Sequence, residues 1–227
     1  MRGRRKHEFK GRSSGRRGVG KMLTEAASKM LGGLTSPECL FRPTQVLASF
    51  PSEAKGIYGW WFKTVPPPVP SEGLCKFKGM SLLYLGVGPD SERSRRFLRQ
   101  RMGDHIKPDA SRSTFRNSLG CILADALRLQ LECVRTSRAK GGGLHLHFGF
   151  GSGEDRLSRW MEENTSISWV EFDRPWEIEP GLISQLALPL NLEHNSRHPF
   201  YADLQALRRH HREGAKRRVD PANHRNS

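Results

Sequence analysis

The sequence predicts an α+β fold in which a small antiparallel β-sheet is flanked by helices, and three observations favour it. Two short β-prone segments, 56–62 and 81–88, precede the main helical patterns. Later segments alternate between helical apolar spacing and strand-like alternation. At 227 residues, a hydrophobic share of 36% still allows a chain to bury a core. We therefore expect one folded domain with basic, disordered ends.

The charge distribution divides the chain into four segments. We expect a disordered basic arm at 1–21, an N-terminal helix and linker at 22–52, a folded domain at 53–206 and a basic tail at 207–227. Of the net charge of +15, the arm carries +8 and the tail +5, so only +2 remains between them. Basic tails bind polyanions such as nucleic acid without sequence preference, and the alternative that they are merely solvated stays open.

The first elements are one helix and two strands. Thr24 as a capping residue and the glycines at 32–33 as a stop predict a short helix. The aromatic segment 56–62 (GIYGWWF) predicts a strand, and the proline run at 66–70 makes a stiff connection. The segment 81–88 (SLLYLGVG) predicts a second strand, and two strands joined in this way should pair antiparallel.

Two helical patterns follow. Helical spacing predicts a first helix over about 97–106 and a second over about 113–132. The second has a wide apolar stripe that should face the core, made of Phe115, Leu119, Ile122, Leu123, Ala126, Leu127 and Leu131.

The remaining elements alternate between strands and helices. The alternation in 144–150 (LHLHFGF) predicts a strand, after which Ser152 caps a helix. The segment 167–172 predicts a further strand, and the last helix is expected at 182–188, where Pro189 ends it. The chain shows no internal repeat.

A band of positive charge lies inside the otherwise balanced domain. Residues 93–116 carry a net charge of +6. Such a band would contact a phosphate backbone, although a solvated helix face is the plain alternative. Besides Arg101, discussed below, the candidate nucleic-acid-binding residues are Arg93, Arg95, Arg96, Arg99, Lys107, Arg112 and Arg116.

Composition excludes several classes of protein. No stretch approaches the roughly 20 apolar residues that span a bilayer, and no apolar run follows the basic N-terminus. We expect a soluble cytoplasmic protein without a membrane partner. The four cysteines form no C-x-x-C pair, which argues against a disulfide framework or a four-sulfur zinc site: Cys39, Cys75, Cys121 and Cys133.

Five features in order carry a resemblance to a known family. They are GIY at 56–58, YLG at 84–86, an arginine-bearing helix, a late glutamate and an asparagine after it. Over roughly 53–200 the chain resembles the GIY-YIG nuclease superfamily, and within it the bacterial proteins that begin GIY-x-W-W and end in P-W-E and L-P-L-N-L. The resemblance implies a fold with a small sheet flanked by helices. It also implies an enzyme that cuts phosphodiester bonds with one divalent metal ion, Mg²⁺ or Mn²⁺.

The resemblance assigns roles to four upstream residues. Tyr58 matches the tyrosine that activates the attacking water, and Tyr84 the one that helps to position the water or the phosphate. Arg101 matches an arginine whose guanidinium suits the transition-state phosphate oxygens. His105 matches a position that often carries a supporting polar or aromatic residue, with simple packing as the alternative.

Two downstream residues complete the expected site. Glu179 is the expected metal ligand, because apolar residues at the i+3, i+4 and i+7 positions place its carboxylate on the apolar face of a helix, where a charge needs a partner. Pro180 leaves open that Glu179 is a capping residue instead. Asn191 matches an asparagine that closes the site and holds the tyrosine or a phosphate oxygen, with a plain turn residue as the alternative.

The sequence thus predicts a metal-dependent endonuclease that acts on nucleic acid, with DNA as the expected substrate, by a one-metal mechanism. The alternative is a non-catalytic nucleic-acid-binding module on the same fold. The 26 residues from Tyr58 to Tyr84 and the 78 from Arg101 to Glu179 exceed those of the smallest members, which implies insertions. A separate metal site formed by four histidines is a minor alternative: His145, His147, His194 and His198.

Overall fold

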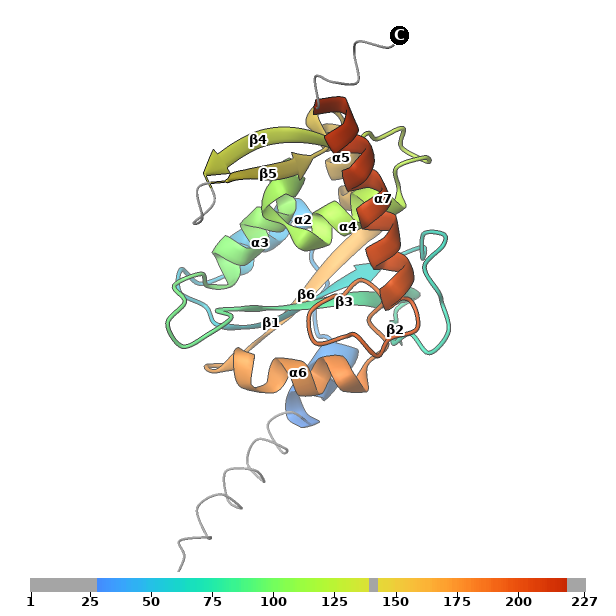
Figure 1. The fold of residues 1–227 in the computed structure, drawn as a ribbon. Coiled ribbons are helices and arrows are strands. Elements are labelled where there is room, and N and C mark those ends of the chain that lie inside the picture. Colours follow the sequence, from blue (N-terminus) through green and yellow to red (C-terminus); the bar gives the residue numbers. More distant parts are fainter. Residues whose placement is uncertain (1–27, 139–142, 220–227) are drawn as a thin grey trace, which may run out of the picture.

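A computed structural model describes residues 28–138 and 143–219 and shows an α+β fold (Figure 1). A four-stranded antiparallel sheet with the order β2-β3-β1-β6 lies between helices, which confirms the predicted fold class. Among these residues, no helix combines the length and apolar character needed to cross a membrane. In chain order the elements are α2 (Pro43–Ser49), β1 (Gly56–Phe62), β2 (Lys76–Phe77), β3 (Met80–Gly88), α3 (Leu98–Ile106), η1 (Ala110–Arg112), α4 (Thr114–Ile122), β4 (Glu132–Arg138), β5 (Leu144–Gly149), η2 (Gly151–Gly153), α5 (Glu154–Asn164), β6 (Thr165–Glu171), α6 (Pro175–Gln185) and α7 (Tyr201–Val219).

The centre of the sheet is the pair of strands that carries the two tyrosines. Strand β1 is buried along its whole length and pairs antiparallel with β3 on one side and β6 on the other. Tyr58 lies opposite Gly86, and Trp60 lies opposite Tyr84. The expected antiparallel pairing of the two segments is confirmed.

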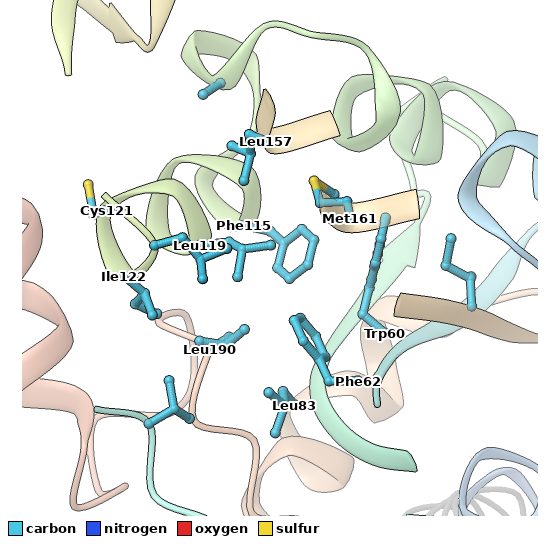
Figure 2. Close-up of a cluster of buried hydrophobic side chains, with 14 of the residues drawn as sticks. Trp60, Phe62, Leu83, Phe115, Leu119, Cys121, Ile122, Leu157, Met161 and Leu190 are labelled. Carbon is cyan, nitrogen blue, oxygen red and sulfur yellow. The ribbon is translucent and has the colours of Figure 1, made fainter. Parts of the chain in front are cut away.

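Two hydrophobic cores fill the two faces of this sheet. Trp60 and Phe62 from β1 pack with Phe115 and Leu119 from α4 in the larger core (Figure 2). On the opposite face, α6 packs in a second core with residues of β1 and β3, among them Ile57, Trp61, Leu85 and Val87. The sheet is therefore enclosed between α3, α4 and α5 on one side and α6 on the other.

The second predicted helix is shorter than expected. It ends at Ile122 as α4, and the expected helical residues up to 132 instead form turns that lead into β4. Arg128 adopts a left-handed backbone conformation with a φ of 50°, which no α-helix contains. Leu129 and Leu131 are nevertheless buried. Their apolar side chains follow the spacing of the helix, and for this reason the sequence predicts a longer helix than the structure has. Strand β4 pairs with β5 in a separate two-stranded sheet.

The predicted C-terminal tail is helical as far as the structure describes it. Helix α7 runs through the boundary that we placed at 206, and it packs against α4 and β4. Within α7 only Leu204 and Ala215 are buried, so the sequence carries little apolar periodicity there. The predicted arm at 1–21 and residues 220–227 lie outside the described residues.

Three other helix boundaries differ from the prediction. Helix α5 begins at Glu154 with Gly153 as its N-cap residue, so Ser152 does not cap it. The N-terminal helix does not stop at the glycines 32–33 but continues to Thr35, whose hydroxyl donates a hydrogen bond to the carbonyl of Leu31; its expected cap, Thr24, is not described. The helix that we expected at 182–188 is α6, which begins at Pro175, ends at Gln185 and contains Pro180 in its interior. Glu179 therefore lies inside a helix and is not its cap.

Candidate active site

The two tyrosines lie on one face of neighbouring strands. Their ring centroids are 6.4 Å apart. A Cβ atom at Gly86 would lie 2.3 Å from the Tyr58 hydroxyl oxygen, so the glycine leaves the space that this ring fills. Gly86 belongs to the second tripeptide, but nothing in the sequence marks it as a site residue, because the register between strands is a tertiary property.

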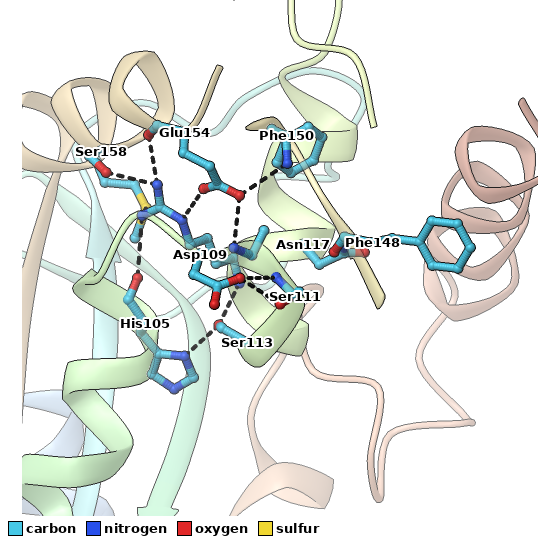
Figure 3. Close-up of polar contacts among 12 residues, drawn as sticks. His105, Asp109, Ser111, Ser113, Asn117, Phe148, Phe150, Glu154 and Ser158 are labelled. Atoms are coloured by element: carbon cyan, nitrogen blue, oxygen red, sulfur yellow. Dashed lines mark hydrogen bonds and ion pairs between the residues drawn. The ribbon is translucent and has the colours of Figure 1, made fainter. Parts of the chain in front are cut away.

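Tyr58 is held by a short chain of hydrogen bonds. Its hydroxyl lies 2.6 Å from Nε2 of His105, and Nδ1 of His105 lies 2.7 Å from Oγ of Ser113 (Figure 3 shows the second contact). Ser113 caps α4 by accepting the backbone N–H of Arg116. The Ser113 hydroxyl proton is not needed for this cap, so the hydroxyl can donate it to Nδ1 of His105. The Nε2–H of His105 can then donate to the Tyr58 hydroxyl oxygen. Ser113 was not identified from the sequence.

Burial sets the charge states of these groups. Burial, followed by the charges of Arg101, Arg96 and Arg116, lowers the pKa of His105 to about 3, so the ring is neutral at pH 7. Burial raises the pKa of Tyr58 to about 12, although Arg101 opposes that rise. His105 therefore cannot keep a proton taken from Tyr58, but it can stabilise a phenolate by donating a hydrogen bond.

Arg101 reaches the tyrosines from α3. Its Nε donates to the carbonyl of Val87 at 3.2 Å, at the end of β3, and one Nη lies 3.7 Å from the carboxylate of Asp90. Burial acts to lower its pKa, but the neighbouring Tyr58, Tyr84 and Asp90 raise it overall. Arg101 is thus a permanent positive charge fixed at the end of the tyrosine strands.

Glu179 lies on α6, near enough to Arg101 for that charge to act on its pKa. The side chain is half-buried, and among the described residues its carboxylate has no ion pair and no hydrogen bond. Burial and then the Glu193 carboxylate raise its pKa to about 7, against the effect of Arg101. Two residues earlier on the same helix, Glu177 pairs with Arg174. Of these two glutamates of α6, Glu179 is therefore the one without an ion pair in the described part of the chain.

An unpaired, half-buried carboxylate is suited to a divalent cation. No group of three or more His, Cys, Asp or Glu side chains able to hold a metal occurs in the described part of the chain. A protein-enclosed metal cage is therefore not formed there. A site with one carboxylate fits Mg²⁺, which keeps several waters and takes its remaining ligands from substrate phosphate oxygens.

Asn191 does not have the expected role. Its Oδ1 accepts the backbone N–H of Leu85 at 2.9 Å, and its Nδ2 donates to the carbonyl of the same residue at 2.7 Å. Both ends of the amide are used on β3 between Tyr84 and Gly86, so they do not hold the tyrosine hydroxyl or a phosphate. Asn191 is a positioning residue that fixes the strand.

One member of the arginine band was wrongly assigned to the surface. Arg116 is fully buried, and its Nε donates to the Glu154 carboxylate at 2.7 Å. The same guanidinium donates to the hydroxyl of Ser158 and the carbonyl of Glu154, both at 2.7 Å (Figure 3). It therefore stabilises the junction of α4 and α5 and does not reach nucleic acid.

The other members of the band are exposed, but few of them lie on one helix. Only Arg99 and Arg101 belong to α3. Asp104 pairs with both Arg96 and Arg112 and so reduces the local positive charge. The exposed side chains outside α3 lie in the segments before and after it: Arg93, Arg95, Arg96, Lys107 and Arg112.

The alternative histidine metal site is not formed. The rings of His145 and His147 lie 4.7 Å apart on β5. They gather no third ligand among residues 28–138 and 143–219, so His194 and His198 do not complete a site with them.

Comparison with protein families connects this geometry to a known domain. Residues 56–210, more than half of the chain, match the family model described as the GIY-YIG catalytic domain. The match includes both tyrosine strands, α3 and α6. No curated protein and no solved structure matches the chain. The domain is one of nuclease-type activity on nucleic acid, generally with a divalent metal ion, and the chain belongs to the GIY-YIG catalytic domain family.

Proposed function

We propose that the protein is a divalent-metal-dependent endonuclease that hydrolyses phosphodiester bonds in DNA by a one-metal mechanism. The observation that supports this most directly is the unpaired carboxylate of Glu179, whose charge is coupled to Arg101 and to both tyrosines. The carboxylate from α6, the guanidinium from α3 and the two phenols from β1 and β3 are near enough for their charges to affect one another's pKa.

Glu179 would hold Mg²⁺ or Mn²⁺, which supplies positive charge for a phosphate oxygen when it is bound. Arg101 would bind a second oxygen of the same phosphate, because a guanidinium offers several donors in a fixed plane. Its anchorage to Val87 and Asp90 limits how far the side chain can move. The negative charge that develops on the phosphate during hydrolysis would thus be stabilised by the guanidinium of Arg101, which is already in position.

Tyr58 would accept the proton of the attacking water in its phenolate form, after it has released its own phenolic proton to solvent. With a pKa of about 12 the phenol is almost entirely protonated at pH 7, so the phenolate must be stabilised by its surroundings. Arg101 contributes a positive charge and His105 a hydrogen bond to the phenolic oxygen. Tyr84, whose pKa burial also raises, remains a phenol that can position the water.

Nicking of supercoiled plasmid in the presence of Mg²⁺ or Mn²⁺ tests this function. Glu179→Ala and Arg101→Ala should each lower the rate by about a hundredfold or more. The matched controls are Glu177→Ala on the same helix and Arg159→Ala, an exposed arginine on α5, and both should retain activity. Unchanged rates in the first pair would refute the assignments. Salt-sensitive DNA binding without metal-stimulated cleavage would instead favour the non-catalytic binding module.

A further inference from the structure

A basic groove lies beside the candidate active site. It has a volume of about 470 Å³ and is bordered by β5, by the η1–α4 junction and by α7. Four cationic side chains line it, Arg112, Arg208, Arg212 and Lys216, and no carboxylate does. We call it the hairpin groove, after the β4–β5 hairpin that forms one wall.

The cations on α7 are arranged along one stripe of the helix. Arg208, Arg212 and Lys216 follow one another at intervals of four residues, so all three point to the same side. Like charges at this spacing destabilise a helix. Because the groove contains no acid to compensate them, an anionic ligand is what would balance this stripe.

Two buried polar atoms at the groove have no partner. The Nε of Arg208 and the Oδ1 of Asn117 are both buried, and neither has a hydrogen bond among the described residues. Asn117 as a whole is only 3% exposed, and both residues line the groove. An unpaired buried polar atom is unfavourable. Because neither atom has exposed surface, a ligand would contact the exposed cations of the groove and not these two atoms.

The groove is also close to the catalytic tyrosine. Ser113 lines it and contacts His105, which in turn contacts Tyr58. The neighbouring Arg112 lines the groove and reaches back to Asp104 on α3. The groove and the hydrogen-bonded chain of Tyr58 therefore share Ser113.

We propose that the hairpin groove binds backbone phosphates of the nucleic-acid substrate away from the bond that is cut, a proposal that rests on nucleic acid being the substrate. Arg212 and Lys216 are exposed and provide the phosphate contacts. On the opposite wall, Leu144 is 68% exposed and Phe148 is half-buried, so an apolar surface is available to sugars and bases. The groove thus extends the substrate contact well beyond the reacting phosphate.

Binding of a fluorescent oligonucleotide, followed by anisotropy in EDTA so that no cleavage occurs, tests the proposal. The double variant Arg212→Gln/Lys216→Gln removes two charges from the stripe. The control Arg209→Gln/Arg217→Gln removes two charges from exposed positions of the same helix that do not line the groove. Circular dichroism and thermal unfolding of both proteins check that α7 remains folded.

We expect Kd to rise about tenfold in the groove variant and the slope of log Kd against log salt to fall by about 1.5 to 2, because two phosphate contacts are lost. The control should change Kd by less than about threefold. Equal weakening in both variants, or no weakening in either, would overturn the proposal. Plasmid nicking distinguishes a failure of the groove proposal from a failure of the proposed function. If only the groove proposal is wrong, both variants cut with the KM of the wild type. If only the nuclease assignment is wrong, groove-dependent binding persists without metal-stimulated cleavage.

Discussion

Glu179→Gln should stabilise the metal-free protein above neutral pH. In the wild type, the folded structure holds this carboxylate half-buried and unpaired, and its pKa rises from 4.5 to about 7. An amide of nearly the same size does not have to lose a proton. The substitution therefore removes an unfavourable charge while it also removes the proposed metal ligand.

The pKa change fixes both the sign and the pH range. Below about pH 4.5 the carboxyl is protonated in the folded and the unfolded chain. Between 4.5 and about 7 the folded chain keeps a proton that the unfolded chain has lost, so the wild type loses stability as the pH rises. At about 1.4 kcal/mol for each pH unit the full loss is about 3 kcal/mol. Because the side chain is partly exposed to water, we expect about 1–2 kcal/mol at pH 8.

Urea unfolding in EDTA from pH 4.5 to 8.5 measures this difference, with Glu177→Gln as the control on the same helix. The stability advantage of Glu179→Gln should grow with pH and level off above pH 7. Adding Mg²⁺ at a hundredfold excess over its Kd should then stabilise the wild type by about 2.7 kcal/mol and leave the variant unchanged. A variant that is no more stable than the wild type at pH 8 would refute an unpaired carboxylate at this position.

Three further substitutions test the packing around the site. Gly86→Ala puts a methyl group 2.3 Å from the Tyr58 hydroxyl oxygen, so it should lower the unfolding free energy by about 1–3 kcal/mol and the nicking rate by more than tenfold. The control is Gly103→Ala, whose added carbon meets no atom within 4 Å outside its own helix backbone, and it should leave the nicking rate unchanged. Asn191→Ala leaves a backbone N–H and C=O of β3 unpaired and should lower the unfolding free energy in urea by about 2–4 kcal/mol; unaltered stability would argue against its positioning role. Glu154→Gln strands a buried guanidinium and should lower thermal stability by about 3–5 kcal/mol, and a loss below about 1 kcal/mol would contradict the buried pair.

The sheet and its tyrosines could be predicted because their signals are local. The segments 56–62 and 81–88 are short, apolar and close in sequence, so strand type and antiparallel pairing follow from composition and connection. The helix of Arg101 likewise shows its own spacing. The family resemblance rests on these same elements.

The errors concern partners that are distant in sequence. Nothing around Arg116 distinguishes it from the exposed arginines before it, because its partner Glu154 lies 38 residues away. Asn191 was expected to reach substrate, but its partner is a backbone group 106 residues earlier. Helix α7 buries so few of its residues that its packing against α4 left almost no apolar pattern in the sequence.

The outer edge of β3 has a consequence for association between molecules. Beyond the two residues covered by β2, the carbonyl of Leu83 accepts the N–H of Leu190, Asn191 occupies both backbone groups of Leu85, and Arg101 occupies the carbonyl of Val87. An open strand edge is a template on which a second chain can add by hydrogen bonding. Here four backbone groups of that edge are already paired, three of them by Asn191 and Arg101, so few groups are left for a second strand to add along β3.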